Sequence, residues 1–242
     1  MPEFSASLQH HFANLLVSFE TVLGALPWLC TGAAISVLVV ACALSIGFCL
    51  GVPFSVLQVY GNPVSRRAVS LYVWFFRGVP ILVLLFLFYF GIAYQLHIDI
   101  SPFAASCLVL GLTSTAYQSQ IFRGAILSLP SGQMKAALAV GMSKNTAIRS
   151  IILPQALRLS IPGWSNEFSI LLKDSVLVSV LGTMELMART KAVATRTKEY
   201  TAFFIAAAII YFIITLMGTR LLAYLERKTR VPGYNQHHQA DA

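Results

Sequence analysis

The sequence predicts an all-α integral membrane protein with about five transmembrane helices and one short helix on the cytoplasmic side. Hydrophobic residues make up 57% of the 242 residues and charged residues only 11%, whereas about 25% of an ordinary soluble domain is charged. The apolar residues also form runs long enough to cross a bilayer, which takes about 20 residues. So few charges could not cover a water-facing surface, and the composition therefore excludes a soluble globular protein.

Five apolar runs are candidate transmembrane helices, and they lie at 27–60, 69–94, 102–129, 157–187 and 201–225. The first run is expected to be a retained span, because no Lys or Arg precedes it as one would in a cleaved signal peptide. Gly47, Gly51 and Pro53 near its end indicate close helix packing or a bend.

Basic residues decide which end of the chain lies inside, because five spans place the two ends on opposite sides. With the N-terminus outside, twelve Lys and Arg residues lie on the cytoplasmic side and four lie on the outer side. The sequence therefore predicts an outside N-terminal segment (1–26), a transmembrane domain (27–227) and a cytoplasmic tail (228–242) that is expected to be disordered. The net charge of +8 is explained by basic residues gathered on the cytoplasmic side, so no nucleic-acid partner is expected.

A polar segment at 131–156, between the third and fourth spans, predicts a short cytoplasmic helix. Ser131 is a candidate N-cap, residues 134–140 are good helix formers, and Gly141 suits a C-terminal cap. Ser143 can cap a second helix, which Pro154 would bend. Eight helical residues span only about 12 Å, so this helix cannot cross a membrane and is suited to contact another protein.

The fourth run contains four polar residues, Asn166, Glu167, Lys173 and Asp174, within about 120° of one helix face. Ionisable groups inside a bilayer are costly and therefore suggest a function. The face either lines a translocation pathway for a charged or zwitterionic solute, or it forms a structural polar cluster that holds helices together.

Polar residues in two other spans are further candidates, and those of the third span permit the same two interpretations. Thr113, Tyr117 and Gln120 share a face of the third span by i, i+3 and i+4 spacing, and Tyr117 and Gln120 are the stronger pathway candidates. Arg77 and Arg123 lie near the cytoplasmic ends of their spans. They are expected to anchor those ends at the interface, with gating or contact to a partner as the alternative.

Four motifs in this sequence resemble those of one transporter family. The stretch "SGQMKAALAVGMSKNTAIRSIILPQALRLSIP" is similar to the EAA loop of the membrane subunits of binding-protein-dependent ABC importers. The matching positions are Ala136, Ala137, Gly141, Ile152, Leu153 and Pro154. "FFRGVPILVLLF", "AYQSQIFRGAILSLPSGQ" and "LLKDSVLVSVLG" resemble segments of the polar amino-acid permeases of this family, of the histidine, glutamine, glutamate and arginine type. The resemblance covers residues from about 27 to 227.

The resemblance implies a role for the short helix and a set of partners. The helix would be the coupling helix, seated in a cleft of a separate ABC ATPase. Nucleotide would bind that partner, because this chain has no G-x-x-x-x-G-K-[ST] loop. A second permease, either identical or unlike, and an external solute-binding protein complete the importer. The implied coupling residues are Gln133, Lys135, Ala136, Ala137, Gly141, Leu153 and Pro154.

Three departures from the family pattern are visible. Lys135 stands where the family usually has the Glu of Glu-Ala-Ala, Gln120 replaces a Glu, and Ser175-Val176 replaces Thr-Ser. The reversed charge at Lys135 suggests either a matched ATPase or one half of a pair of unlike permeases.

The leading interpretation is a multi-pass permease subunit of the bacterial inner membrane that imports a polar amino acid, embedded in lipid and driven by a partner ATPase. The alternative is a self-contained secondary carrier or channel. A membrane-embedded enzyme is not expected, because neither an H-E-x-x-H motif nor metal-ligand cysteine spacing occurs. No cofactor or metal site is expected on this chain.

Overall fold

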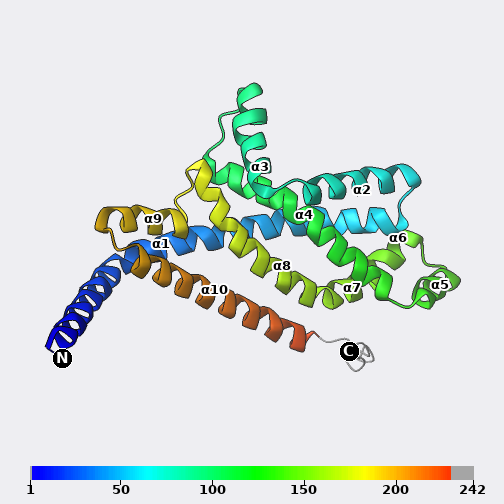
Figure 1. Cartoon of the computed structure of the whole chain (residues 1–242). Helices are drawn as coiled ribbons and strands as arrows, with labels where there is room; N and C mark the ends of the chain where they lie inside the picture. Colours follow the sequence, from blue (N-terminus) through cyan, green and yellow to red (C-terminus); the bar gives the residue numbers. More distant parts are fainter. Residues whose placement is uncertain (1, 230–242) are drawn as a thin grey trace.

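The computed structural model describes residues 2–229, with side chains from Phe19 onward, and every element in this part is helical. The long helices pack side by side in an elongated bundle (Figure 1). The helices are α1 (Pro2–Tyr60), α2 (Pro63–Gly78), α3 (Ile81–Phe86), α4 (Pro102–Ser128), α5 (Ser131–Ala139), α6 (Lys144–Ala147), α7 (Leu153–Leu159), α8 (Ile161–Asp174), α9 (Leu186–Thr197) and α10 (Tyr200–Lys228). Two π-helical turns, η1 (Leu87–Ala93) and η2 (Ile148–Ile152), and a 3₁₀ segment, η3 (Ser175–Leu181), complete the order.

The first and last predicted spans are confirmed as long apolar helices. Within the described residues, Phe19–Tyr60 of α1 and all of α10 are long and apolar enough to cross a membrane. The third predicted span is the single 27-residue helix α4, and the fourth is divided among α7, α8 and η3. The number of five crossings stays a prediction. Of the predicted tail, only residues 228 and 229 lie within the described range.

The second predicted span is not one straight helix. It is divided into α2 and the α3–η1 segment, which are bent by 105° relative to each other. Val79 at the break is extended, with φ −97° and ψ 132°, because the ring of Pro80 disfavours helical geometry in the residue before it. Figure 1 shows α3 rising away from the layer that contains α2 and α4.

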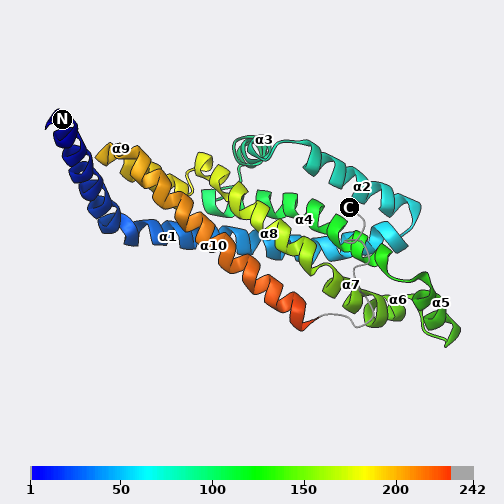
Figure 2. The ribbon, with the colours of Figure 1, turned by 60° about the horizontal axis from the view of Figure 1, so that its bottom comes forward.

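The contact between α1 and α4 is the most extensive between any two helices in the described part of the chain. Val39, Val40 and Ala43 of α1 share a buried core with Val109 and Leu110 of α4. Helix α8 also packs against α4, and α10 packs against α8 and α9. Figure 2 shows α10 running along this bundle, with α9 at one end and α5 at the other.

The close packing predicted at Gly47 and Gly51 is confirmed. A Cβ atom at Gly47 would overlap the side-chain amide of Gln118 and lie 2.9 Å from Ser114 Oγ. At Gly51 it would lie 3.2 Å from the backbone nitrogen of Ser119. The absence of side chains on this stripe of α1 lets the backbone of α4 approach closely, as small residues do between membrane helices.

We predict that Gly47→Ala destabilises the fold while Gly24→Ala, on the same helix, does not. A methyl group at Gly47 must displace Gln118, and such overpacking costs about 1–3 kcal/mol. No atom lies within 4 Å of a Cβ at Gly24, and Ala is the better helix former there. The midpoint of thermal unfolding of the detergent-purified protein measures both, and equal midpoints would contradict the packing account.

Candidate functional site

Helix α5 has a well-defined C-terminal cap at Gly141, which confirms the predicted cap. The N–H of Gly141 donates to Leu138 O at 3.0 Å and the N–H of Met142 donates to Ala137 O at 3.1 Å, the two bonds of a Schellman motif. Gly141 has φ +83°, a left-handed conformation that glycine adopts without the steric cost of a side chain. The helix begins at Ser131 itself, with Pro130 in the N-cap position rather than Ser131 as predicted.

The segment after α5 fastens this helix to the bundle. Ser143 accepts the N–H of Thr146 at 3.2 Å and so caps α6, as predicted. Gln133 and Gln155 exchange two amide hydrogen bonds, each of 2.9 Å. Lys144 Nζ donates to Tyr60 O, the last residue of α1, at 2.9 Å. Helix α5 is therefore bonded to α7 through Gln133, and the α6 segment that follows it is bonded to the end of α1.

The predicted coupling residues divide into an exposed and an inward-facing group. Lys135, Ala136, Gly141 and Pro154 are exposed, Ala137 is buried, and Gln133 and Leu153 are partly buried. Two apolar side chains beside them also face outward, Leu138 at 48% exposure and Val140 at 78%. The outer surface of α5 thus combines one positive charge with exposed apolar groups.

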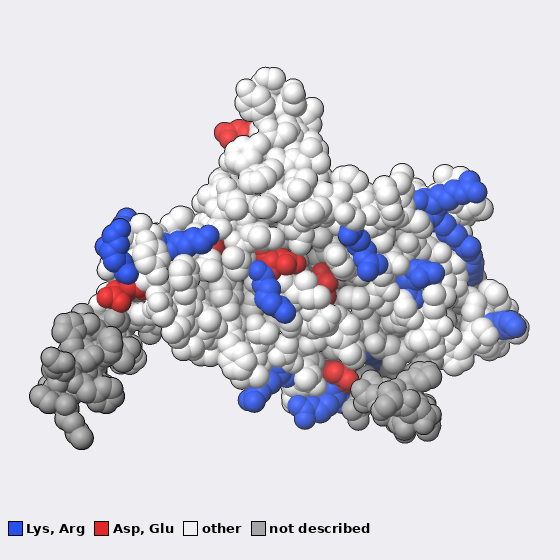
Figure 3. Space-filling model, viewed as in Figure 1, with Lys and Arg blue, Asp and Glu red and all other residues white. Residues whose placement is uncertain are grey.

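The predicted polar face of the fourth span is divided by the packing of α8. Glu167 is buried at 3% exposure against α4, where its Oε1 accepts a hydrogen bond of 2.8 Å from Ser114 Oγ. Asn166 and Lys173 are exposed and Asp174 is partly buried. Figure 3 shows acidic and basic side chains next to each other at the middle of the face that carries α4 and α8.

Glu167 ends a buried chain of polar groups that links three helices. Trp164 Nε1 donates to Gln118 Oε1 at 2.7 Å, and Gln118 Nε2 donates to Ser114 Oγ at 2.9 Å and to Leu44 O at 3.1 Å. Buried polar groups are stable only when they are satisfied in this way. Sequence reasoning missed Ser114, Gln118 and Trp164, although the i, i+4 spacing of Ser114 and Gln118 within an apolar helix could have indicated them.

The two stronger candidates on α4, Tyr117 and Gln120, each contact a side chain of another helix. The guanidinium carbon of Arg77 lies 5.0 Å from the centre of the Tyr117 ring, a cation–π contact. Gln120 Nε2 donates to Gln58 Oε1 at 2.8 Å. Thr113 is buried and bonds the carbonyl of Val109 at 2.9 Å, so it serves the helix rather than an open surface.

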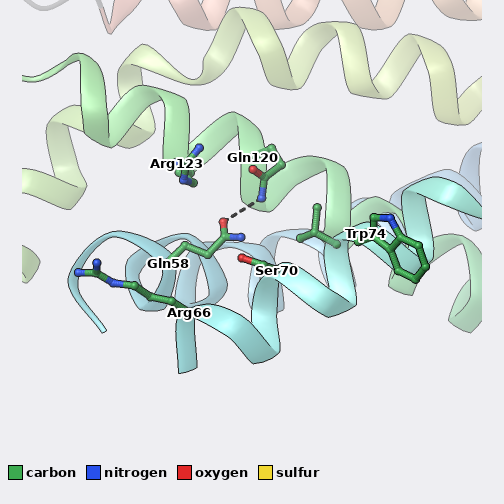
Figure 4. Close-up of a pocket in the computed structure, with 7 residues that line it drawn as sticks. Gln58, Arg66, Ser70, Trp74, Gln120 and Arg123 are labelled. Atoms are coloured by element: carbon green, nitrogen blue, oxygen red, sulfur yellow. Dashed lines mark hydrogen bonds between the residues drawn. The ribbon is translucent and has the colours of Figure 1, made fainter. Parts of the chain in front are cut away.

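Gln120 also lines a cavity of about 520 Å³ between the end of α1, α2 and α4 (Figure 4). The cavity is lined by Gln58, Arg66, Ser70, Val73, Trp74, Gln120 and Arg123. Of these residues, sequence reasoning had singled out only Gln120 and Arg123.

A second buried carboxylate, Glu185, organises the opposite end of the bundle. Its oxygens accept the N–H groups of Met187 at 2.8 Å and Ala188 at 2.7 Å, which caps α9. The Tyr211 hydroxyl of α10 donates to it at 2.7 Å, and Ser36 of α1 at 3.3 Å. This group joins three helices and is structural. Among the described residues, no group of three His, Cys, Asp or Glu side chains could hold a metal ion.

The apolar spans, the buried polar chains and the projecting helix together define an all-helical membrane protein. The sequence matches the family of binding-protein-dependent transport system inner membrane components over residues 43–231. The chain therefore belongs to this family, and it is the membrane component of a transport system whose ATP hydrolysis takes place on a separate subunit.

Several known proteins are similar over nearly their whole length. The "probable amino-acid permease protein YxeN" of Bacillus subtilis (strain 168) is 36% identical, covering 89% of this chain and 97% of that protein. The arginine ABC transporter permease protein ArtQ of Escherichia coli (strain K12) is also 36% identical, covering 84% of this chain and 95% of that one.

Solved structures have the same fold. The crystal structure of an amino acid ABC transporter with histidines has a TM-score of 0.79 and 31% identity, covering 87% of this chain and 98% of that one. The MetNI methionine ABC transporter in an inward-facing conformation has a TM-score of 0.69 at 20% identity, covering 84% of this chain and 97% of that one, and is similar in fold.

Proposed function

We propose that this chain is the permease subunit of an ATP-driven importer that moves a polar amino acid across the bacterial inner membrane. The relatives named for amino acids support this substrate class, since they match at 36% identity over most of the chain. The solved neighbour at 31% identity is an amino acid transporter as well.

The observation that carries the proposal is the form and position of α5. A nine-residue helix projects at one end of the bundle (Figure 1) and is fixed to α7 through the Gln133–Gln155 pair. The α6 segment that follows it is fixed to α1 through Lys144. Lys135, Leu138 and Val140 are exposed on it. A rigid projection of this kind suits a coupling helix that follows the closure of an ATPase cleft and moves the long helices with it.

The proposed orientation places the α5 end in the cytoplasm and the α9 end outside, where a solute-binding protein would deliver the solute. It rests on the excess of Lys and Arg on the α5 side. A second permease subunit would complete the pathway. Lys135 in place of the usual Glu favours an unlike second subunit.

We infer that the face of α8 with Asn166, Lys173 and Asp174 lines this pathway, together with Tyr117 and Gln120 of α4. The exposed Lys173 and the partly buried Asp174 would be costly in contact with lipid, so this face is expected to meet water or the second subunit. Glu167, buried behind it, is expected to hold α8 against α4.

Purification of the tagged protein from its native membrane in mild detergent tests the importer. We expect an ATPase subunit with a G-x-x-x-x-G-K-[ST] loop to co-purify, identified by mass spectrometry. A second, unlike permease in the same complex would settle the composition of the pair. A lone oligomer without ATPase, in a detergent that preserves other ABC complexes, would refute the proposal.

Gly141→Pro is predicted to uncouple ATP hydrolysis from uptake while the protein still inserts. Proline fixes φ near −65° and has no N–H, whereas position 141 has φ +83° and donates to Leu138 O. Gly132→Ala is the matched control on α5, because nothing lies within 4 Å of a Cβ there. ATPase activity and solute uptake are measured in proteoliposomes of the whole complex. Normal uptake by Gly141→Pro would rule out α5 as the coupling helix.

Asp174→Asn is predicted to reduce uptake at least tenfold without impairing assembly, if the α8 face lines the pathway. Glu167→Gln is the matched comparison on the same helix. An amide oxygen at position 167 can still accept the bond from Ser114, so this variant is expected to transport nearly normally. Uptake and the yield of intact complex separate the two roles. If Asp174→Asn fails to assemble, the residue is structural.

A further inference from the structure

The cavity between α1, α2 and α4 carries an unbalanced positive charge. Two of its seven lining residues are arginines on different helices, Arg66 on α2 and Arg123 on α4, and none is a carboxylate. Its volume of about 520 Å³ lies within the range of about 300–1,000 Å³ that small-molecule sites occupy. Its charge and size therefore suit a small anion or a zwitterion.

Both guanidinium groups retain capacity for a ligand. Arg66 Nη2 donates to the carbonyl of Val59 at 2.9 Å, which holds the group in place and leaves its other N–H donors available. Arg123 has no side-chain hydrogen bond or ion pair to any residue in the described range 2–229. Guanidinium groups bind carboxylates and phosphates through paired, charge-assisted hydrogen bonds.

The amide pair adds groups that an amino acid can use. Figure 4 shows Gln58 and Gln120 bonded to each other, with Ser70 beside Gln58 and with Arg66 and Arg123 on the same side of the pair. Because Gln120 Nε2 donates to Gln58 Oε1, the NH₂ group of Gln58 and the carbonyl of Gln120 are left to bond a ligand. The first can donate to a carboxylate and the second can accept from an ammonium group.

The cavity continues the proposed pathway toward α5. Tyr117, Gln120 and Arg123 follow one another at three-residue intervals along α4, which places them on one side of the helix. Gln58 lies in the last turns of α1 and Arg66 in the first turns of α2, and both turns are at the α5 end of the bundle (Figure 1).

We propose that this cavity is an exit-side site for the carboxylate of the transported solute, and that its two arginines select acidic and neutral amino acids over basic ones. Arg123 and Arg66 hold the carboxylate, and Gln120 accepts from the ammonium group. The assignment rests on the proposed importer function and adds to it a substrate class.

Trp74 provides the measurement, because it lines the cavity and its side chain is 73% exposed. The complex with its co-purifying subunits is placed in phosphatidylcholine nanodiscs and titrated with L-glutamate, L-glutamine and L-arginine. We expect a saturable change in tryptophan fluorescence with the first two, absent in Trp74→Phe, and affinity for L-arginine at least about tenfold lower.

Arg123→Gln is expected to lower the affinity for L-glutamate about tenfold or more, since it removes a hydrogen bond between charged groups. Arg66→Gln should act in the same direction. Arg123→Lys keeps the charge and should retain part of the affinity, which distinguishes ligand binding from a folding defect. The matched control is Arg67→Gln, the next residue on α2, which is exposed but does not line the cavity.

Two results would overturn the exit-side site. The first is a complex that imports an amino acid with ATP but shows no Trp74-dependent fluorescence change with any of the three amino acids. This result would refute the site and leave the importer function supported. The other is occupation by lipid: nanodiscs containing phosphatidylglycerol would abolish the L-glutamate signal, and excess L-glutamate would not restore it. A complex that shows no ATP-driven uptake of any amino acid would instead refute the importer itself.

Discussion

The close approach of α1 and α4 is the constraint on which the rest of the structure depends. Because Gly47 has no side chain, Gln118 fits against α1 and bonds the carbonyl of Leu44. The same amide then holds Trp164 of α8 and Ser114, which in turn bonds Glu167. In an apolar environment these polar groups have no water to bond, so their mutual satisfaction fixes how α1, α4 and α8 lie against each other.

The two ends of this bundle differ in how far their side chains are bonded within the chain. At one end, Glu185 joins α1, α9 and α10 through hydrogen bonds from Ser36, Tyr211 and the first turn of α9. At the other end, α5 is fastened to the rest of the chain but presents exposed apolar and basic groups. A bundle with a projecting helix, and with acidic and basic side chains exposed at the middle of one face (Figure 3), suits a subunit of a larger assembly.

Much of the short helix α5 could be predicted, because local chemistry determines it. Gly141 caps α5 with a positive φ and Ser143 caps α6, as the residue types indicate. The break in the second span was missed, although the Pro80 that causes it is visible in the sequence, because hydropathy averages over a window and does not register a single bend. The sequence also did not indicate that the Gln133 amide pairs with Gln155 within the chain, because the two residues lie on different helices.

The sequence by itself determined the class of protein, the positions of the first and last spans and the transporter family, because composition, run length and local motifs are properties of neighbouring residues. Only the tertiary structure decided which polar side chains meet. Glu167 and Asn166 are adjacent in sequence, yet one is buried against Ser114 and the other is exposed. Arg66 and Arg123 are 57 positions apart and line one cavity. Such contacts depend on how helices rotate and pack against each other, which periodicity within one helix does not specify.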